Sequence, residues 1–201
     1  MRALALAAAL LLAACSNSPQ GGDQGLYSVA PSAPPASLAP SVVPGIGDGT
    51  FRVAVDIKPG TYRTRTPSPN CYWERLSGFS GALSDVIAND NTDAPAVVTI
   101  KATDAGFKSD SCAPWSHDLS AITAGQTSFG DGTYIVKTDM TPGTYASAGG
   151  TGCYWERLSG FGGTNGEILA NDNVDGPTVV TIKPTDAGFS SNGCADWTRT
   201  Q

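Results

Sequence analysis

The chain has 201 residues and a net charge of −6, with 24 glycines, 14 prolines and only 15% charged residues. Glycine and proline are the weakest helix formers, so this composition argues against a helical bundle. The low charge content disfavours charge-driven disorder, and an acidic chain is repelled by nucleic acid. We therefore expect a folded, acidic β-protein with no nucleic-acid partner.

The first fifteen residues have the pattern of an export signal. Arg2 precedes an unbroken apolar run over residues 3–14, which is too short to span a bilayer and is typical of a signal peptide. The run ends in Leu-Ala-Ala followed by Cys15, and this ending resembles the lipobox of bacterial lipoproteins. The resemblance implies that residues 1–14 are removed and that Cys15 and the new amino terminus carry acyl chains. The protein would then be extracytoplasmic and attached to the bacterial cell membrane or outer membrane through lipid alone. Ordinary secretion with an incidental cysteine is the alternative.

Residues 15–46 are predicted to form a tether. Six prolines lie among serine, alanine and glycine, and Asp23 is the one charged residue in this segment. Such a composition buries too little apolar surface to offset the entropy of ordering, and proline keeps the chain extended. The alternative is that isolated apolar residues such as Leu26 dock on the folded part.

The rest of the chain is one unit written twice. The sequence CYWERLSGF at residues 71–79 recurs unchanged at residues 153–161. The shorter segments ANDN, VVTIK and TDAGF also recur in the same order. The expected parts are β repeat 1 at 47–115, a connector at 116–129, β repeat 2 at 130–197 and a tail at 198–201. The sequence leaves open whether the copies are tandem domains or two halves of one pseudo-symmetric domain.

This unit resembles a repeat of uncharacterised secreted or lipid-anchored bacterial proteins. The motifs that carry the resemblance are PGTY, CYWERLSGF, ANDN, VVTIK, TDAGF and a cysteine three residues before a tryptophan. The resemblance supports the repeat architecture and implies no particular activity.

Each copy is predicted to be β-structure. Apolar and polar residues alternate from Phe51 to Ile57, as in a strand with one buried face. Pro59-Gly60 then suits a type II turn, and CYWERL and VVTI are further strand candidates. The asparagine and aspartate cluster at residues 89–91 lies between them and is expected to be loop. Short strands with frequent turns indicate an all-β fold, a small sandwich or barrel-like unit in each repeat.

The four cysteines after Cys15 can pair in three ways, and the duplication selects one. Cys71 with Cys112, and Cys153 with Cys194, give both copies the same internal bridge. Closing a loop of this size stabilises a fold by about 4 kcal/mol in the chain-entropy description. Small exported domains commonly need such bridges. We expect Trp73 to pack over the first one.

Catalysis is not expected. The one histidine, His117, lies outside both repeats, so no repeated nucleophile system can be built on it. A glycosidase-like pair of Glu74 or Glu156 with Asp90 or Asp172 is the remaining alternative. We expect Glu74 to form a structural charge pair with Arg75 instead, and we expect no cofactor.

Calcium is a weak alternative for the aspartate clusters. Carboxylate oxygens suit calcium, but neither cluster has the glycine and glutamate spacing of an EF-hand loop. Plain turns are the preferred interpretation of the aspartates concerned, which are Asp90, Asp93, Asp172 and Asp175.

Aromatic residues are the best binding candidates. Aromatic faces suit sugars and protein partners, and two copies on one tether add avidity. The candidate residues are Tyr72, Tyr154, Trp115 and Trp197. Repeat 1 has 7 basic and 8 acidic residues, whereas repeat 2 has 3 and 8, a difference that would suit unlike partners.

The sequence therefore indicates a non-catalytic, lipid-anchored envelope protein that acts as a binding or structural module. The expected partners are the membrane, through the lipid, and a cell-wall glycan or an envelope protein. The alternatives are a surface-exclusion or inhibitor lipoprotein acting on another envelope protein and, less favoured, a cell-wall glycan hydrolase.

Overall fold

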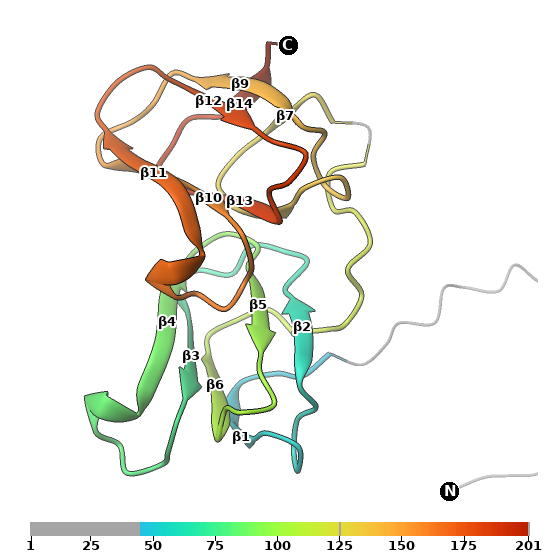
Figure 1. The fold of residues 1–201 in the computed structure, drawn as a ribbon, viewed down its shortest axis with the longest axis vertical. Coiled ribbons are helices and arrows are strands. Elements are labelled where there is room, and N and C mark those ends of the chain that lie inside the picture. Colours follow the sequence, from blue (N-terminus) through green and yellow to red (C-terminus); the bar gives the residue numbers. More distant parts are fainter. Residues whose placement is uncertain (1–44, 125, 201) are drawn as a thin grey trace, which may run out of the picture. The chain divides into compact units, whose positions relative to one another are not determined.

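The computed structural model describes residues 45–124 and 126–200, all within one compact unit that spans residues 41–201 (Figure 1). The predicted signal peptide, Cys15 and nearly all of the predicted tether lie outside the described residues. No helix in the described ranges is long and apolar enough to cross a membrane.

Repeat 1 contains six strands and one turn of 3-10 helix. These elements are β1 (Gly49–Arg52), β2 (Gly60–Arg63), β3 (Cys71–Leu76), η1 (Leu83–Asp85), β4 (Val86–Thr92), β5 (Val97–Ile100) and β6 (Gly106–Asp110).

Repeat 2 has the same series of elements, with one short strand added at each end. They are β7 (Ser128–Phe129), β8 (Gly132–Ile135), β9 (Gly143–Ser147), β10 (Cys153–Leu158), η2 (Asn165–Glu167), β11 (Ile168–Val174), β12 (Thr178–Ile182), β13 (Gly188–Asn192) and β14 (Trp197–Arg199).

Each repeat is an open antiparallel sandwich, so the expected all-β fold is confirmed. In repeat 1 the larger sheet has the order β1-β6-β3-β4, and the smaller one pairs β2 with β5. In repeat 2 the corresponding sheets are β8-β13-β10-β11 and β12-β9-β14-β7. Single bridges from Ile46 to Trp115 and from Arg63 to Ser116 give repeat 1 the pairing that β7 and β14 give repeat 2.

Each sandwich has its own hydrophobic core between the two sheets. In repeat 1, Trp73 and Phe107 from the larger sheet share the core with Tyr62 and Val98 from the smaller sheet. Phe189, Trp155, Tyr145 and Val180 form the equivalent cluster in repeat 2. Duplicated sequence therefore produces duplicated packing, and each copy buries its own apolar face.

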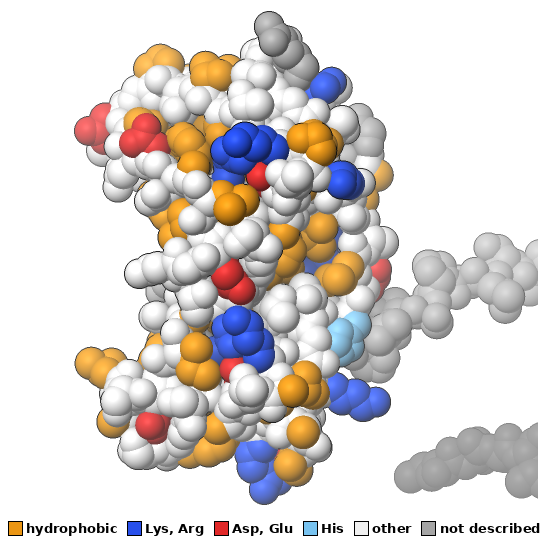
Figure 2. All heavy atoms as spheres, in the orientation of Figure 1, with side chains coloured by type: hydrophobic (Ala, Val, Ile, Leu, Met, Phe, Trp, Pro, Cys, Tyr) orange, Lys and Arg blue, Asp and Glu red, His pale blue; other side chains and the backbone are white. Residues whose placement is uncertain are grey.

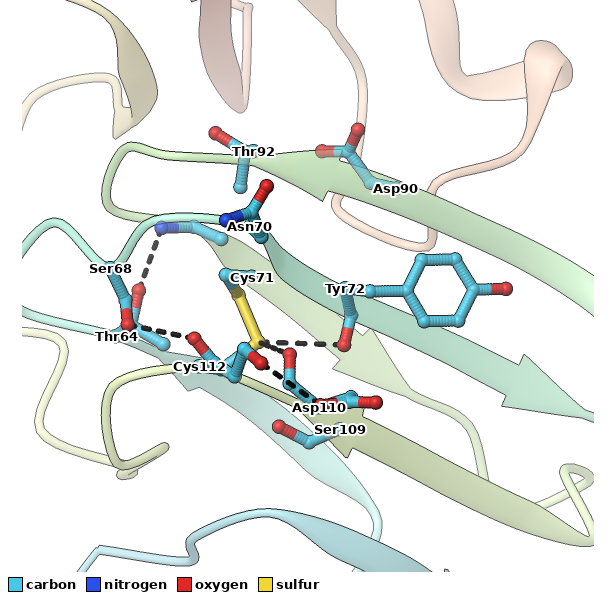
Figure 3. Close-up of a disulfide and its surroundings, with 12 residues drawn as sticks. Thr64, Ser68, Asn70, Cys71, Tyr72, Asp90, Thr92, Ser109, Asp110 and Cys112 are labelled. Atoms are coloured by element: carbon cyan, nitrogen blue, oxygen red, sulfur yellow. Dashed lines mark hydrogen bonds between the residues drawn. A yellow bond between two sulfur atoms is a disulfide. The ribbon is translucent and has the colours of Figure 1, made fainter.

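The two disulfides are those that the duplication predicts. Cys71 is bonded to Cys112 and Cys153 to Cys194. Figure 3 shows the first bridge joining the start of β3 to the segment after β6, with the Tyr72 ring turned away from it. Trp73 is buried on the same face of β3 as Cys71 and belongs to the same core.

The prediction of a continuous strand over residues 51–57 is wrong. β1 ends at Arg52, and a tight turn follows in which Ala54 has a φ of +65° and Val55 is 68% exposed. The turn forms because Asp56 accepts hydrogen bonds from the backbone N–H and side chain of Arg52. Val53 and Ile57 remain buried at its two ends, so the apolar alternation reflects a closed turn.

The prediction of a loop at residues 89–91 is also wrong. These residues belong to β4, and Asp90 lies opposite Trp73 of β3 in the register. β4 is the outer strand of its sheet, and the side chains of residues 89–91 are exposed. An outer strand whose side chains face water tolerates residues that central strands exclude, because β-propensity depends on context.

Candidate ligand-binding site

A polar cavity of about 250 Å³ lies between the two repeats. Repeat 1 contributes one wall, from β3 to β5, and repeat 2 contributes the rest, from β8, β10, β11, β13, η2 and the loop before η2. This volume is just below the range of roughly 300–1,000 Å³ that is usual for small-molecule sites. The repeat 1 wall is formed by Trp73, Asn89, Asp90, Thr92 and Val97.

Backbone hydrogen bonds fix the walls of the cavity against each other. The Thr99 N–H of β5 donates to the Phe161 carbonyl at 2.7 Å, and the Thr133 N–H of β8 donates to the Pro95 carbonyl at 2.8 Å. Nη1 of Arg75 also donates to the Gly162 carbonyl at 2.6 Å. The cavity therefore exists only when both repeats are present.

A fully buried ion pair joins the repeats beside these contacts. Nη1 and Nη2 of Arg63 donate to the two carboxylate oxygens of Asp139 at 3.1 and 2.9 Å, and neither side chain is exposed. Nη1 of Arg63 also donates to the Ser120 carbonyl of the connector. The repeat pattern does not predict this pair, because Arg63 and Asp139 do not occupy equivalent positions in the two repeats.

Tyr154 and Glu156 form the polar centre of the repeat 2 wall. The Tyr154 hydroxyl donates to Oε2 of Glu156 at 2.9 Å and accepts a hydrogen bond from the Asn171 amide. Burial raises the pKa of Glu156. The hydrogen bond from Tyr154 lowers this pKa, and the negative charge of Asp90 raises it further. Asp90 and Glu156, which belong to different repeats, are therefore close enough to repel each other.

Asp90 stands at the open side of the cavity. Its side chain is reached by solvent, yet the surrounding protein displaces enough water to raise the pKa of its carboxyl. Glu167 adds a third carboxylate to the lining, and its Oε2 is buried with no hydrogen-bond donor among the described residues. Of the described residues that line the cavity, none is a lysine, arginine or histidine.

The equivalent surface of repeat 1 has a different charge. There Lys108 lies 3.4 Å from Oε1 of Glu74 and 5.5 Å from the centre of the Tyr72 ring. Ser190 occupies the position of Lys108 in repeat 2. The two Tyr-x-Glu motifs are identical in sequence. A cation neutralises the carboxylate of Glu74, but no described residue forms an ion pair with Glu156.

The expectation that Trp115 and Trp197 take part in binding is wrong. Both are 0% exposed. Nε1 of Trp115 donates to the Ser109 hydroxyl, which in turn donates to Asp48. Trp197 makes the equivalent contact with Ser191. These tryptophans close the sandwich, so of the aromatic candidates only Tyr154 lines the cavity, while Tyr72 lies on the equivalent surface of repeat 1.

The four aspartates proposed for calcium are not gathered. Asp90 lines the cavity, whereas Asp93 accepts a hydrogen bond from the Asn70 N–H. Asp172 accepts from the Asn173 N–H, and Asp175 from the Gly152 N–H. Within residues 45–124 and 126–200, no three histidine, cysteine or acidic side chains are grouped to hold a metal ion.

The expected pair of Glu74 with Arg75 is wrong as well, because adjacent strand residues point to opposite faces. Arg75 pairs instead with Asp104, through Nε and Nη2, each at 2.7 Å. Arg157 and Asp186 repeat this pair. The recurring ERL and TDAGF motifs are thus explained by one structural ion pair in each repeat.

The lone histidine is a packing residue. The His117 ring lies 3.8 Å from that of Tyr62, centre to centre, and its Nδ1 is 3.0 Å from the Thr61 carbonyl.

On the face drawn in Figure 2, acidic and basic side chains are interspersed and are not gathered into one basic surface.

The fold and the cavity define a class of protein: a duplicated, disulfide-bonded β-sandwich protein with a polar site between its two copies. The chain belongs to the family of the Rv1352-like extracellular domain, whose model matches residues 43–116 and 126–198. The described repeats are therefore extracytoplasmic.

The relatives carry no assigned activity. The uncharacterized protein Rv1352 of Mycobacterium tuberculosis and the uncharacterized protein Mb1387 of Mycobacterium bovis are each 32% identical to this chain over 84 residues. Each alignment covers 35% of this chain and 68% of the relative. No solved structure is significantly similar to the chain.

Proposed function

We propose that this protein is a non-catalytic, lipid-anchored envelope protein that binds a hydroxyl-rich ligand, with the chemistry of a cell-wall glycan, between its two repeats. The observation that carries the proposal is the cavity lined by Asp90, Glu156 and Glu167 without a basic side chain. Carboxylates accept hydrogen bonds and do not donate them when ionised, so they select a ligand rich in donors. Sugar hydroxyls provide such donors.

The remaining lining groups suit the same ligand. The Tyr154 hydroxyl and the side chains of Asn89 and Asn165 add both donors and acceptors around the carboxylates. Phe161, which is partly buried, adds an aromatic surface at the cavity wall. Because the volume is small, the site accommodates a short segment of a glycan, and the rest of the polymer would continue into solvent.

The carboxylates are proposed to bind the ligand and not to cleave it. Oε2 of Glu156 is already engaged by Tyr154, and Oδ1 of Asp90 by the Asn91 N–H. Each contact holds its carboxylate in place as an acceptor. Membrane attachment through Cys15 is the second part of the proposal, and it keeps the repeats close to the envelope polymers.

Matched variants of the full chain test ligand binding. Wall-derived glycans are first screened on an array, and the affinity of a retained glycan is then measured by isothermal titration calorimetry. Glu156→Gln should weaken binding by about 10- to 100-fold, as expected for the loss of a hydrogen bond to a charged group. Glu74→Gln changes the same motif outside the cavity of the single chain, at a carboxylate that Lys108 already neutralises, and should leave the affinity unchanged.

The results that would overturn this proposal are distinct. Equal losses in both variants would mean that the cavity is not the site. Cleavage of the glycan by the wild-type chain, abolished by Glu156→Gln, would show a hydrolase. Capture of an envelope protein with no glycan retained would favour the inhibitor alternative. Mass spectrometry of the mature amino-terminal peptide tests the anchor, which is excluded if Cys15 carries no lipid.

A further inference from the structure

The contact between the two repeats uses a different surface of each copy. Repeat 1 contributes its β5 edge, with Pro95, Val97 and Thr99, which we call the edge surface. Repeat 2 contributes residues 160–164 and Thr133 of β8, which we call the loop surface. Since the copies are duplicates, repeat 2 has its own edge surface and repeat 1 its own loop surface. Because the contact joins two unlike surfaces, it leaves the edge surface of repeat 2 and the loop surface of repeat 1 uncovered.

Both open surfaces expose apolar side chains that are covered at the junction. Val179 on the edge surface of repeat 2 is 63% exposed, whereas the equivalent Val97 is 4% exposed. Phe79 on the loop surface of repeat 1 is 54% exposed, whereas the equivalent Phe161 is partly buried. β12, which carries Val179, is an outer strand of its sheet, and exposed apolar edges of this kind favour strand-edge association.

We infer that the edge surface of repeat 2 binds the loop surface of repeat 1 in a second copy of this chain. The arrangement is head to tail and repeats the junction that the chain already contains. This inference concerns the ends of the molecule and does not depend on the ligand proposed for the cavity.

The loop surface of repeat 1 has the geometry that the junction requires. Gly81 has a φ of +80° and the equivalent Gly163 a φ of +71°, so the two loops follow the same path. The ring of Phe79 lies against Gly106 as that of Phe161 lies against Gly188. A hollow of about 370 Å³ on repeat 1 is lined by the residues equivalent to the repeat 2 wall of the cavity, among them Thr50, Glu74, Phe79 and Gly81.

The backbone groups of the junction are also duplicated. The Thr181 N–H of β12 corresponds to the Thr99 N–H that bonds to Phe161, so its acceptor in a second copy would be the Phe79 carbonyl. The Thr50 N–H corresponds to the Thr133 N–H that bonds to Pro95. β1 and β8 pair with β6 and β13 in the same register, so both N–H groups point outward from the sheet edge.

The charged links are duplicated as well. Lys101 lies 3.6 Å from Glu167 across the junction, and the equivalent residues Lys183 and Asp85 keep both charges. Arg157 uses Nε and Nη2 for Asp186, and no described residue accepts a hydrogen bond from its Nη1. At the junction, the equivalent nitrogen of Arg75 binds a carbonyl of the loop surface.

One link differs, and a second change compensates for it. Ala146 stands where repeat 1 has Arg63, so the edge surface of repeat 2 lacks the cation that neutralises Asp139. The residue of repeat 1 equivalent to Asp139 is Asp56, which is instead neutralised by Arg52 of the same turn, at 2.9 Å. Docking therefore does not leave Asp56 without a cation.

Ser80 also replaces Gly162 in the loop. A Cβ at Gly162 would lie 2.6 Å from Oε2 of Glu167 and 2.9 Å from Nη1 of Arg75. In repeat 1 the acidic residue is Asp85, which is one methylene shorter, and Ser80 already donates to it through its N–H and its hydroxyl. The remaining approach is to Nη1 of Arg157, whose side chain is 12% exposed.

Sedimentation velocity of the full chain carrying Cys15→Ser, which has no thiol for lipid, tests the inference. The wild-type surfaces should give concentration-dependent association beyond the dimer, because a head-to-tail contact leaves two open ends. Val179→Lys should lower the association constant by about tenfold or more, as expected when the burial of one valine is lost. Val55→Lys is the matched control at an equally exposed valine and should have no effect.

A mixing experiment separates this arrangement from a symmetric dimer. Val179→Lys disables one end of the chain and Phe79→Lys the other, so each variant alone should stay monomeric. Mixed, they should form a dimer that grows no further, because one intact end of each kind remains. A wild-type chain that stays monomeric, equal effects of Val179→Lys and Val55→Lys, or a mixture that stays monomeric would each overturn the inference.

Discussion

The Arg63→Ala substitution tests whether the two repeats unfold as one cooperative unit. The guanidinium is fully buried and crosses the junction to both oxygens of Asp139. Without it the carboxylate stays buried, with the N–H groups of Ile122 and Ile135 as its remaining donors. Removing one partner of a buried pair costs about 3–5 kcal/mol, and we expect this loss in the free energy of unfolding.

A matched control is present in the same molecule. Arg52 pairs with Asp56 at the equivalent turn of repeat 1, but both side chains are in contact with solvent. An exposed pair contributes only about 0.2–1 kcal/mol, so Arg52→Ala should have a small effect. Arg63→Ala also introduces the residue that repeat 2 carries naturally at this position, Ala146, so the strand tolerates alanine there.

Differential scanning calorimetry of the full chain gives the result directly. A domain of this size loses about 2–4 °C in melting temperature per kcal/mol, so Arg63→Ala should lower it by roughly 6–20 °C. We expect one transition for the wild-type chain. Two wild-type transitions, with the variant shifting only one of them, would refute the reasoning, as would equal shifts for Arg63→Ala and Arg52→Ala.

Two further predictions concern the same junction. Gly163→Ala should destabilise the fold more than Gly81→Ala, as measured by chemical denaturation. Both glycines have a positive φ, but only at Gly163 would an added Cβ meet Trp73, at 2.7 Å. Equal losses in the two variants, each of about 1–3 kcal/mol from backbone strain alone, would show that Trp73 does not contact this loop. Asp90→Asn should lower the pKa of Glu156 toward its ordinary value, measured by NMR of the side-chain carboxyl, because the charge of Asp90 helps to raise it. Because the pKa of Glu156 is raised in the folded state, the free energy of unfolding increases as the pH falls through that pKa. Asp90→Asn should make this increase smaller. An unchanged pKa of Glu156 would show that the two carboxylates do not interact.

Sequence identity between the copies made most of the fold predictable. The two sandwiches follow from the repeated strand and turn patterns, and the bridge from Cys71 to Cys112 follows from requiring the same connectivity in both copies. These features are local to one repeat. A pattern that occurs twice constrains them twice, so they could be inferred without a structure.

The cavity could not be predicted, because the residues that form it differ between the copies or lie at unlike positions. Asp90 and Glu156 belong to different repeats, and their proximity depends on how one sandwich packs on the other. The replacement of Lys108 by Ser190 was the available signal. Its meaning becomes clear only when Lys108 is seen to neutralise Glu74.

The difference in charge between the repeats supports one shared ligand over two independent ones. Arg63 and Arg65 bind the connector or repeat 2, and alanine stands at both equivalent positions of repeat 2, Ala146 and Ala148. The loss of Lys108 in repeat 2 leaves Glu156 without a cation at the cavity wall. Divergence toward separate partners would place the changes on outward surfaces of each copy. Of the basic residues that repeat 2 lacks, Arg63 and Arg65 lie at the junction, and Lys108 lies at the position equivalent to Ser190 of the cavity wall. A ligand that needs both repeats would be bound at this junction.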